Sequence, residues 1–368
     1  MGRADRHGAD GRGSWALNHE TGRRAQRWAS SPGKDFIMKF GIIGCGSIAE
    51  NSFGPSLLTS ERTDLVAVCR RDLEAAKAFA ARFSSPRAYG SAAELVRDDR
   101  VEAVIVSTPT DTHCDYTCLA AEHGKHVLCE KPMARNAAEC REMIAACRAH
   151  GVTLAVAYRR RTCPQVVAAK RLIAAGRIGR VVFARTHYSG RWDPEAGDWR
   201  IEPGIGGALM EMASHRIEVL LNFGGRPQSV SAVVDAVDHD WPVDDTDALI
   251  VRFEGGGIGM HSTILTSPPR HDFAQIDGDG GRILIDPLEL TADHLILELP
   301  DGTERIEVEP LQEKLFDLPM IEDFVTAAER GEKPVCDAES GYWVQAVSDA
   351  ACASSSSGAV VAVEPLGS

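Results

Sequence analysis

From Lys39 onwards, short runs rich in β-branched residues alternate with amphipathic stretches of helical period. Regular alternation of strands and helices is typical of βαβ units that build a parallel sheet. The first helices are expected at 47–59, 72–83 and 136–148. The pattern predicts a doubly wound Rossmann domain over residues 38–157. Its strands are expected at 39–43, 64–69, 87–89, 103–107, 126–129 and 152–157.

Residues 158–368 show a different pattern, in which strand candidates follow one another between about 229 and 299 without intervening helices. Strands in succession, separated by Gly and Asp turn residues, predict an antiparallel sheet. We therefore expect a second α/β domain with a large, open and mostly antiparallel sheet. Long helices are expected at 206–223, 314–330 and 339–354, and the last two are candidates to pack back on the Rossmann domain.

The net charge of −13 at pH 7 argues against a nucleic-acid partner or an anionic membrane surface, because both would require a basic face. No run approaches the ~20 apolar residues that a membrane span needs. The ten cysteines form no Cys-x-x-Cys pair and are expected as buried thiols in a reducing, cytoplasmic compartment. Residues 1–37 are expected to be a disordered extension or a mis-assigned start, since Met38 directly precedes the first strand.

A G-x-G-x-x-A motif spans Gly44–Ala49, after the first strand and at the start of a helix. The first glycine permits a tight turn, and the second lets a pyrophosphate approach the backbone at the positive end of the helix. This context predicts a dinucleotide site rather than a merely structural turn. The cofactor contacts expected here are Gly44, Gly46, Ser47, Ile48 and Ala49.

The end of the second strand decides which dinucleotide is favoured. An NAD(H) site would place an acidic residue there, but the chain has Arg70 and Arg71. Because a guanidinium can grip a 2′-phosphate, we expect both arginines to contact the cofactor and NADP(H) to be preferred, with NAD(H) still allowed. In the alternative, Arg70 is solvated or stacks on adenine while Asp72 binds the ribose. We expect Asp72 to cap the following helix instead.

Three further segments complete a family pattern: Thr108–His113, the strand end Glu130-Lys131-Pro132, and Gly206–Glu218. With the glycine motif, they closely resemble the Gfo/Idh/MocA oxidoreductases, relatives of glucose-fructose oxidoreductase and inositol dehydrogenase. The resemblance extends from about Met38 to the C-terminus. It implies the two domains above and an open sheet that commonly forms the oligomer interface, so a homodimer or homotetramer is expected.

The resemblance also implies roles for particular residues. Lys131 and His215 match the catalytic lysine and histidine, and Glu211 occupies the position that is usually Asp. Arg161 resembles an arginine that lines the substrate pocket, and Trp192 is a candidate pocket wall, although core packing is an equal alternative. Glu218 is interpreted as a surface or interface charge. The remaining cofactor contacts implied are Thr108, Pro109, Thr110, His113, Glu130 and Lys131.

The chemistry of hydride transfer fits these residue types. Oxidation of a carbinol needs a group that takes the hydroxyl proton and a positive charge near the developing alkoxide. We expect Lys131 to supply the charge and His215 the proton exchange. Glu211 and His215 are at i and i+4, so Glu211 is expected to orient the imidazole and favour its protonated form. Contact between the longer Glu211 side chain and the substrate remains open.

The sequence therefore predicts an NADP(H)-dependent oxidoreductase acting on a sugar, keto-sugar or cyclitol. One alternative is an NAD-dependent inositol or sugar dehydrogenase. Another is a glycoside-cleaving relative that oxidises its substrate transiently with tightly bound NAD, and a third is a binding regulator on the same fold. No metal is expected. Cys114 and Cys118, beside His113, are interpreted as small apolar residues on a helix rather than as metal ligands.

Overall fold

The computed structural model describes residues 36–195 and 197–367. The expectation for residues 1–37 falls almost wholly outside these described residues. Within them, no helix combines the length and the apolar character that crossing a bilayer requires.

The first sheet has the strand order β3-β2-β1-β4-β5-β6, and every neighbouring pair is parallel. This order reverses between β1 and β4, as in a doubly wound dinucleotide fold, so the predicted fold class is confirmed. β4 is buried at every position because helices cover both faces of the sheet. The strands are β1 (Met38–Ile43), β2 (Thr63–Cys69), β3 (Ala88–Tyr89), β4 (Ala103–Val106), β5 (His126–Cys129) and β6 (Leu154–Val156).

The helix expected at 47–59 contains a π-helical turn at Ala49–Phe53 and continues as α2. The short helix α4 was not expected from the sequence, although Ser91 and Glu94 form a capping box at its start. The helices around this sheet are α2 (Gly54–Thr59), α3 (Leu73–Arg82), α4 (Ala92–Val96), α5 (His113–Glu122) and α6 (Ala137–Ala149).

The second sheet has the order β14-β13-β12-β11-β7-β10-β9-β8-β15 and is antiparallel except for β7 and β10, which run parallel. The prediction of a mostly antiparallel sheet is therefore confirmed. β14 was missed because its residues are largely polar and exposed, which leaves no apolar alternation to recognise. The strands are β7 (Val181–Ser189), β8 (Pro227–Asp235), β9 (Thr246–Phe253), β10 (Ile258–Ile264), β11 (His271–Gly278), β12 (Arg282–Ile285), β13 (His294–Leu299), β14 (Gly302–Glu307) and β15 (Val361–Ala362).

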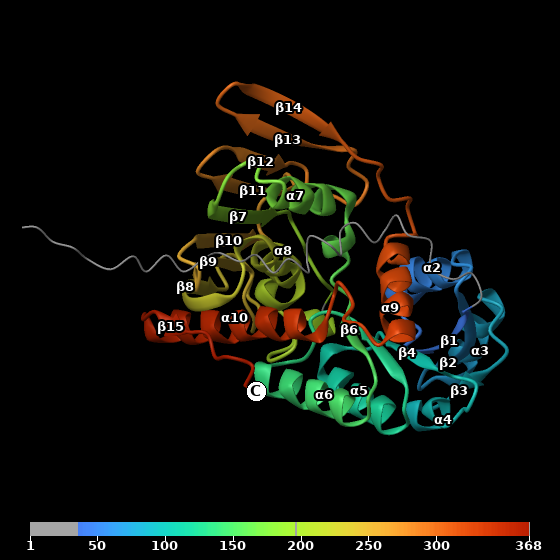
Figure 1. The fold of residues 1–368 in the computed structure, drawn as a ribbon. Coiled ribbons are helices and arrows are strands. Elements are labelled where there is room, and N and C mark those ends of the chain that lie inside the picture. The colour runs from blue at the N-terminus through green and yellow to red at the C-terminus, as the bar shows by residue number, and fades with distance from the viewer. Residues whose placement is uncertain (1–35, 196, 368) are drawn as a thin grey trace, which may run out of the picture.

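Helices cover one face of the second sheet (Figure 1): α7 (Pro164–Ala174), α8 (Ser214–Gly224) and α10 (Ala338–Ser357). Along β9, buried and exposed residues alternate, as expected for a sheet with one covered face. The outward positions include apolar side chains, among them Val233 at 66% and Ile250 at 53% exposure. The second face of the sheet is thus partly apolar and uncovered in the single chain.

The C-terminal helix α9 (Leu318–Arg330) packs against the first sheet, beside α2 (Figure 1). Met320, Ile321 and Phe324 share a buried cluster with the strand β1. The rings of Phe324 and Phe40 lie 6.0 Å apart. α10 contacts α6 as well as β8, so the last helices join the two sheets.

Candidate active site

The glycine turn lies between β1 and the first helix. Gly44 has a φ of +101°, and a Cβ there would lie 2.5 Å from the Ser107 carbonyl oxygen, so a side chain is excluded. A Cβ on Gly46 would meet nothing within 4 Å, so the space beside this backbone is open. Ser47 and Ile48 are exposed while Ala49 is fully buried. The turn therefore fits a pyrophosphate at the helix N-terminus.

Arg70 lies beside this turn and donates a hydrogen bond from Nη1 to the Cys45 carbonyl oxygen at 3.2 Å. Asp72 accepts hydrogen bonds from the backbone N–H groups of Glu74 and Ala75, at 3.0 and 3.1 Å. The prediction that Asp72 caps the second helix is confirmed. Arg71 is exposed next to both residues.

The loop after β4 holds the next group of predicted residues. Thr108 and Pro109 are half-buried, while Thr110 and His113 are buried. The His113 ring lies between two backbone carbonyls, with Nε2 2.9 Å from the Thr108 oxygen and Nδ1 2.9 Å from the Pro132 oxygen. In this position His113 joins the loop after β4 to the loop after β5.

Lys131 follows the end of β5 and points at the start of the long helix. Its Nζ donates to the Glu211 carbonyl oxygen at 2.9 Å and to the Glu211 carboxylate at 3.3 Å. The neighbouring Glu130 carboxylate accepts from the Lys131 backbone N–H at 2.8 Å and pairs with Arg159 at 3.4 Å. Burial raises the pKa of Glu130 above its ordinary value. Two ion pairs therefore hold this strand end in place.

Glu211 lies in a π-helical turn, Leu209–Ala213, that leads into α8. The start of this turn is capped from a distant loop, because Asp244 accepts from the Leu209 N–H at 2.7 Å and from the Ala208 N–H at 2.9 Å. Gly207, with a φ of +105°, leaves room for the Asp244 side chain. π turns inside helices are frequent at functional sites.

His215 follows on α8, half-buried, with the Tyr158 ring edge-on at 6.4 Å. Burial lowers the pKa of His215 well below its ordinary value, and the nearby charges of Lys131, Arg160 and Arg216 lower it further. The expectation that Glu211 would favour the protonated imidazole is therefore wrong. The i,i+4 argument assumes 3.6 residues per turn, which the π turn changes, and the Glu211 carboxylate pairs with Lys131 instead.

Three residues at this junction, Glu211, His215 and Tyr158, each have a buried polar atom without a hydrogen-bond partner among the described residues. They are Nδ1 of His215, Oε1 of Glu211 and the hydroxyl of Tyr158. Orphaned buried polar atoms are costly in folded proteins, so a cluster of them indicates a site built for something other than stability. Tyr158 was not singled out from the sequence, since a tyrosine after a strand has no distinctive pattern.

Arg161 and Glu218 form a buried ion pair, with Nε 2.5 Å from the carboxylate oxygen. Arg161 also donates to the Val335 carbonyl and the Ser340 hydroxyl. Glu218 is 1% exposed, so the interpretation of Glu218 as a surface charge is wrong. Trp192 packs edge-on against Trp241, with ring centroids 5.5 Å apart, and the Arg200 guanidinium lies 5.3 Å from the centre of its ring.

A second buried charge network lies behind His215 and was missed in the sequence. Arg160 and Arg216 both pair with Asp272, and Arg160 Nη2 is 2.9 Å from the carboxylate. The Arg216 guanidinium also lies 4.2 Å from the centre of the Tyr188 ring. These partners are far apart in the chain, so no local spacing could reveal them. They surround the imidazole with positive charge.

The doubly wound parallel sheet, with its open glycine turn after β1, is the fold of a dinucleotide-binding protein. Residues 38–158 match a family model described as an oxidoreductase family with an NAD-binding Rossmann fold. Residues 166–284 match the Gfo/Idh/MocA C-terminal domain. The chain belongs to the Gfo/Idh/MocA family and is an NAD(P)-binding oxidoreductase, as its sequence predicts.

Two relatives illustrate the similarity. D-xylose 1-dehydrogenase (NADP(+)) 2 of Haloferax volcanii is 30% identical over 329 residues, which are 89% of this chain and 100% of the relative. Trans-1,2-dihydrobenzene-1,2-diol dehydrogenase of Mus musculus is 36% identical over 236 residues, 62% of this chain and 69% of the relative. Levoglucosan dehydrogenase in complex with NADH and levoglucosan superposes with a TM-score of 0.81 at 25% identity, covering 89% of this chain and 99% of that structure.

Proposed function

We propose that this protein transfers a hydride between NADP(H) and a carbinol or carbonyl carbon of a sugar, keto-sugar or cyclitol, with Lys131 and His215 as the charge and proton relay. The observation that supports this most is that Glu211, which binds the Lys131 ammonium, and the neighbours His215 and Tyr158 each have a buried polar atom without a partner. A substrate with several hydroxyl groups supplies the hydrogen-bond partners that these atoms lack.

The nicotinamide ring, when bound, supplies the hydride acceptor or donor. His215 is neutral because its pKa is lowered by burial and by neighbouring cations, so its imidazole takes the hydroxyl proton during oxidation and returns it during reduction. Lys131 places positive charge where the alkoxide develops, and its bond to the Glu211 carbonyl fixes the ammonium. Arg161 and Trp192 remain predicted contacts of the substrate.

The preference for NADP(H) rests on Arg70. Its guanidinium lies against the glycine turn, and the Asp72 carboxylate that would otherwise suit an NAD ribose is engaged in the helix cap. A 2′-phosphate beside Arg70 would therefore meet a cation and no free carboxylate. The name of the Haloferax relative also specifies NADP(+), whereas levoglucosan dehydrogenase was solved in complex with NADH.

We also propose a homo-oligomer, a dimer or tetramer, that covers the open face of the second sheet. Val233, Ile250 and Ile258 are exposed on this sheet, and contiguous apolar surface is unfavourable in water. A cytoplasmic location is proposed because all ten cysteines lie in described residues and each is free. Analytical sedimentation of the native chain and of Ile250→Asp tests the assembly. The proposal is refuted if both chains sediment as monomers.

The deciding experiment is a substrate screen in which the absorbance of the reduced nicotinamide is the readout. Aldoses, inositols, keto-sugars and a cyclic trans-diol are each assayed with both cofactors. We expect a sugar or cyclitol to give the highest kcat/KM, with NADP(H) preferred. Turnover of a glycoside without net change in absorbance would favour the transient-oxidation alternative, and better use of NAD(H) would overturn the cofactor assignment.

A further inference from the structure

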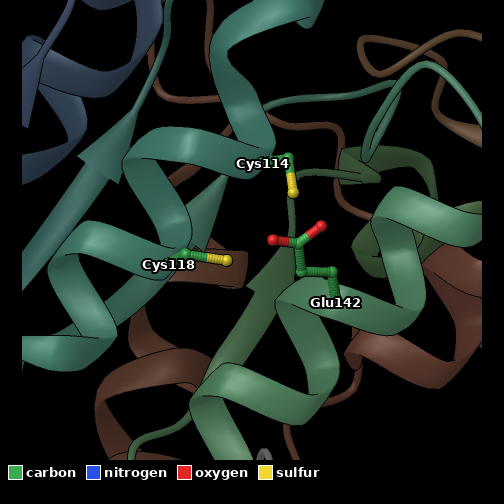
Figure 2. Close-up of side chains that lie close together, drawn as sticks. All are labelled: Cys114, Cys118 and Glu142. Atoms are coloured by element: carbon green, nitrogen blue, oxygen red, sulfur yellow. The ribbon is translucent and has the colours of Figure 1, made fainter.

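Two cysteines and a glutamate meet between two neighbouring helices of the first domain, with Cys114 buried and Glu142 exposed. Cys114 and Cys118 come from α5, and Glu142 comes from the neighbouring helix α6. The two sulfur atoms and a carboxylate oxygen all lie within 4.8 Å of one another. Figure 2 shows the three side chains turned toward a common point between the helices.

We propose that Cys114, Cys118 and Glu142 form a binding site for a thiophilic divalent cation such as Zn²⁺. Thiolates and a carboxylate are the donors that this ion takes in proteins. The i,i+4 spacing puts both sulfurs on one face of α5. The sequence alone supplied only this pair, and the third donor becomes visible when α6 packs beside α5.

The geometry needs little adjustment. With metal–sulfur bonds of about 2.3 Å and metal–oxygen bonds of about 2.0–2.2 Å, the donors of a tetrahedral site lie roughly 3.3–3.8 Å apart. Because the donor atoms lie within 4.8 Å of one another, side-chain movements of no more than about 1 Å would bring them to these separations. Glu142 is exposed and Cys118 is half-buried, so the cation reaches the site from solvent and a water completes its coordination.

The charge around the thiols also suits a cation. A divalent ion at this point would offset two of the three negative charges of the two thiolates and the Glu142 carboxylate, and its binding would release the thiol protons. His113, although adjacent in sequence, is not a ligand because its ring nitrogens lie against backbone carbonyls.

The test is a titration of the freshly reduced full chain with Cd²⁺, which shares this ligand preference. We expect a thiolate-to-metal charge-transfer band that saturates at one cation per chain and is removed by competing Zn²⁺. Cys118→Ser should lose about half of the band or more and weaken binding at least tenfold. Glu142→Gln should keep the band, because it retains both thiols. It should bind the cation more weakly, because the carboxylate ligand is lost.

Cys352→Ser is the matched control, because Cys352 is an exposed cysteine on α10 outside the cluster. Its titration should equal that of the native chain. Unchanged thermal unfolding of each cation-free variant shows that the fold is kept. The proposal is overturned if no band forms at several equivalents of Cd²⁺, if Cys118→Ser leaves it unchanged, or if Cys352→Ser removes it.

Discussion

The ammonium of Lys131 lies 2.9 Å from the backbone oxygen of Glu211 and so joins the end of β5 to the start of the helix that contains His215. One side chain thus links the dinucleotide-binding sheet to the second domain. Its charge also acts on His215, whose pKa is lowered by burial and then by Lys131. We therefore expect changes at Lys131 to alter the chemistry more than the binding of cofactor.

Replacing Lys131 with Met should lower kcat by roughly 10²–10³-fold, the usual cost of removing one group that stabilises a developing oxyanion. The dissociation constant of the reduced cofactor, measured by its fluorescence, should stay within about threefold, a difference under about 1 kcal/mol. Lys77→Met on α3 is the control, because Lys77 is exposed and pairs only with Glu74 in its own helix. A Lys131→Met enzyme with native kcat would refute the assigned role.

The pH dependence of oxidation should reflect His215. Its pKa is lowered, so the imidazole stays neutral and able to accept a proton below its ordinary pKa of 6.5. The midpoint of the acidic limb of kcat/KM should therefore lie below pH 6.5. In Lys131→Met this midpoint should move to higher pH, because one of the cations that lower the pKa of His215 is gone. The profile is measured from pH 4.5 to 9. A native limb above pH 6.5 would contradict a neutral buried imidazole.

Cofactor preference should change at Arg70. We expect Arg70→Asp to reduce the ratio of kcat/KM for NADP(H) over NAD(H) at least tenfold, or about 1.4 kcal/mol of discrimination, because a carboxylate repels the 2′-phosphate. Initial rates with both cofactors give this ratio. Arg87→Asp changes the same charge elsewhere in this domain and should leave the ratio unaltered; an equal effect of both substitutions would point to the overall field instead.

Asp72 distinguishes a helix cap from a ribose ligand. Because its carboxylate accepts from two N–H groups at the start of α3, Asp72→Ala should lower the free energy of unfolding by about 1 kcal/mol. Urea unfolding measures this loss, and the KM for either cofactor should stay unchanged. A raised KM for NAD(H) with native stability would show that Asp72 binds the ribose after all.

Loss of the Asp272 carboxylate should strongly destabilise the charge network behind His215. Asp272→Ala leaves Arg160 and Arg216 buried without their shared carboxylate, and we expect a loss of about 3–5 kcal/mol in urea unfolding. Glu307→Ala removes an exposed partner of Arg305 and should cost under about 1 kcal/mol. Similar costs for the two substitutions would mean that water reaches Asp272.

The parts of the fold that follow from local pattern were predictable. β4 is an unbroken apolar run, and Asp72 is a cap residue before a helical period, so both were placed correctly. Glu218 was misjudged because a charged residue on a helix is usually exposed, and its partner Arg161 lies 57 positions earlier in the chain. Long-range pairing of charges leaves no periodic signal in a sequence.

In the candidate site, too, residues in local motifs were predictable and relations that depend on packing were not. Motifs led to Lys131 and His215, and in the structure the Lys131 charge acts on the His215 imidazole. The relation between Glu211 and His215 was predicted wrongly because the π turn at Leu209–Ala213 has no sequence signature that a regular helical period would contain. Tyr158 was overlooked for a similar reason, since its closeness to His215 depends on how the two sheets pack.

The parallel pairing of β7 with β10 places a topological demand on the chain. Adjacent parallel strands cannot be joined by a hairpin, so the polypeptide must leave the sheet after Ser189 and cross back to the end at which β7 began. α8, which packs on both strands, lies on that return path. The helix bearing His215 therefore lies on a connection that this topology requires. Most of its residues are buried, so the same packing that covers the sheet also fixes the position of the histidine.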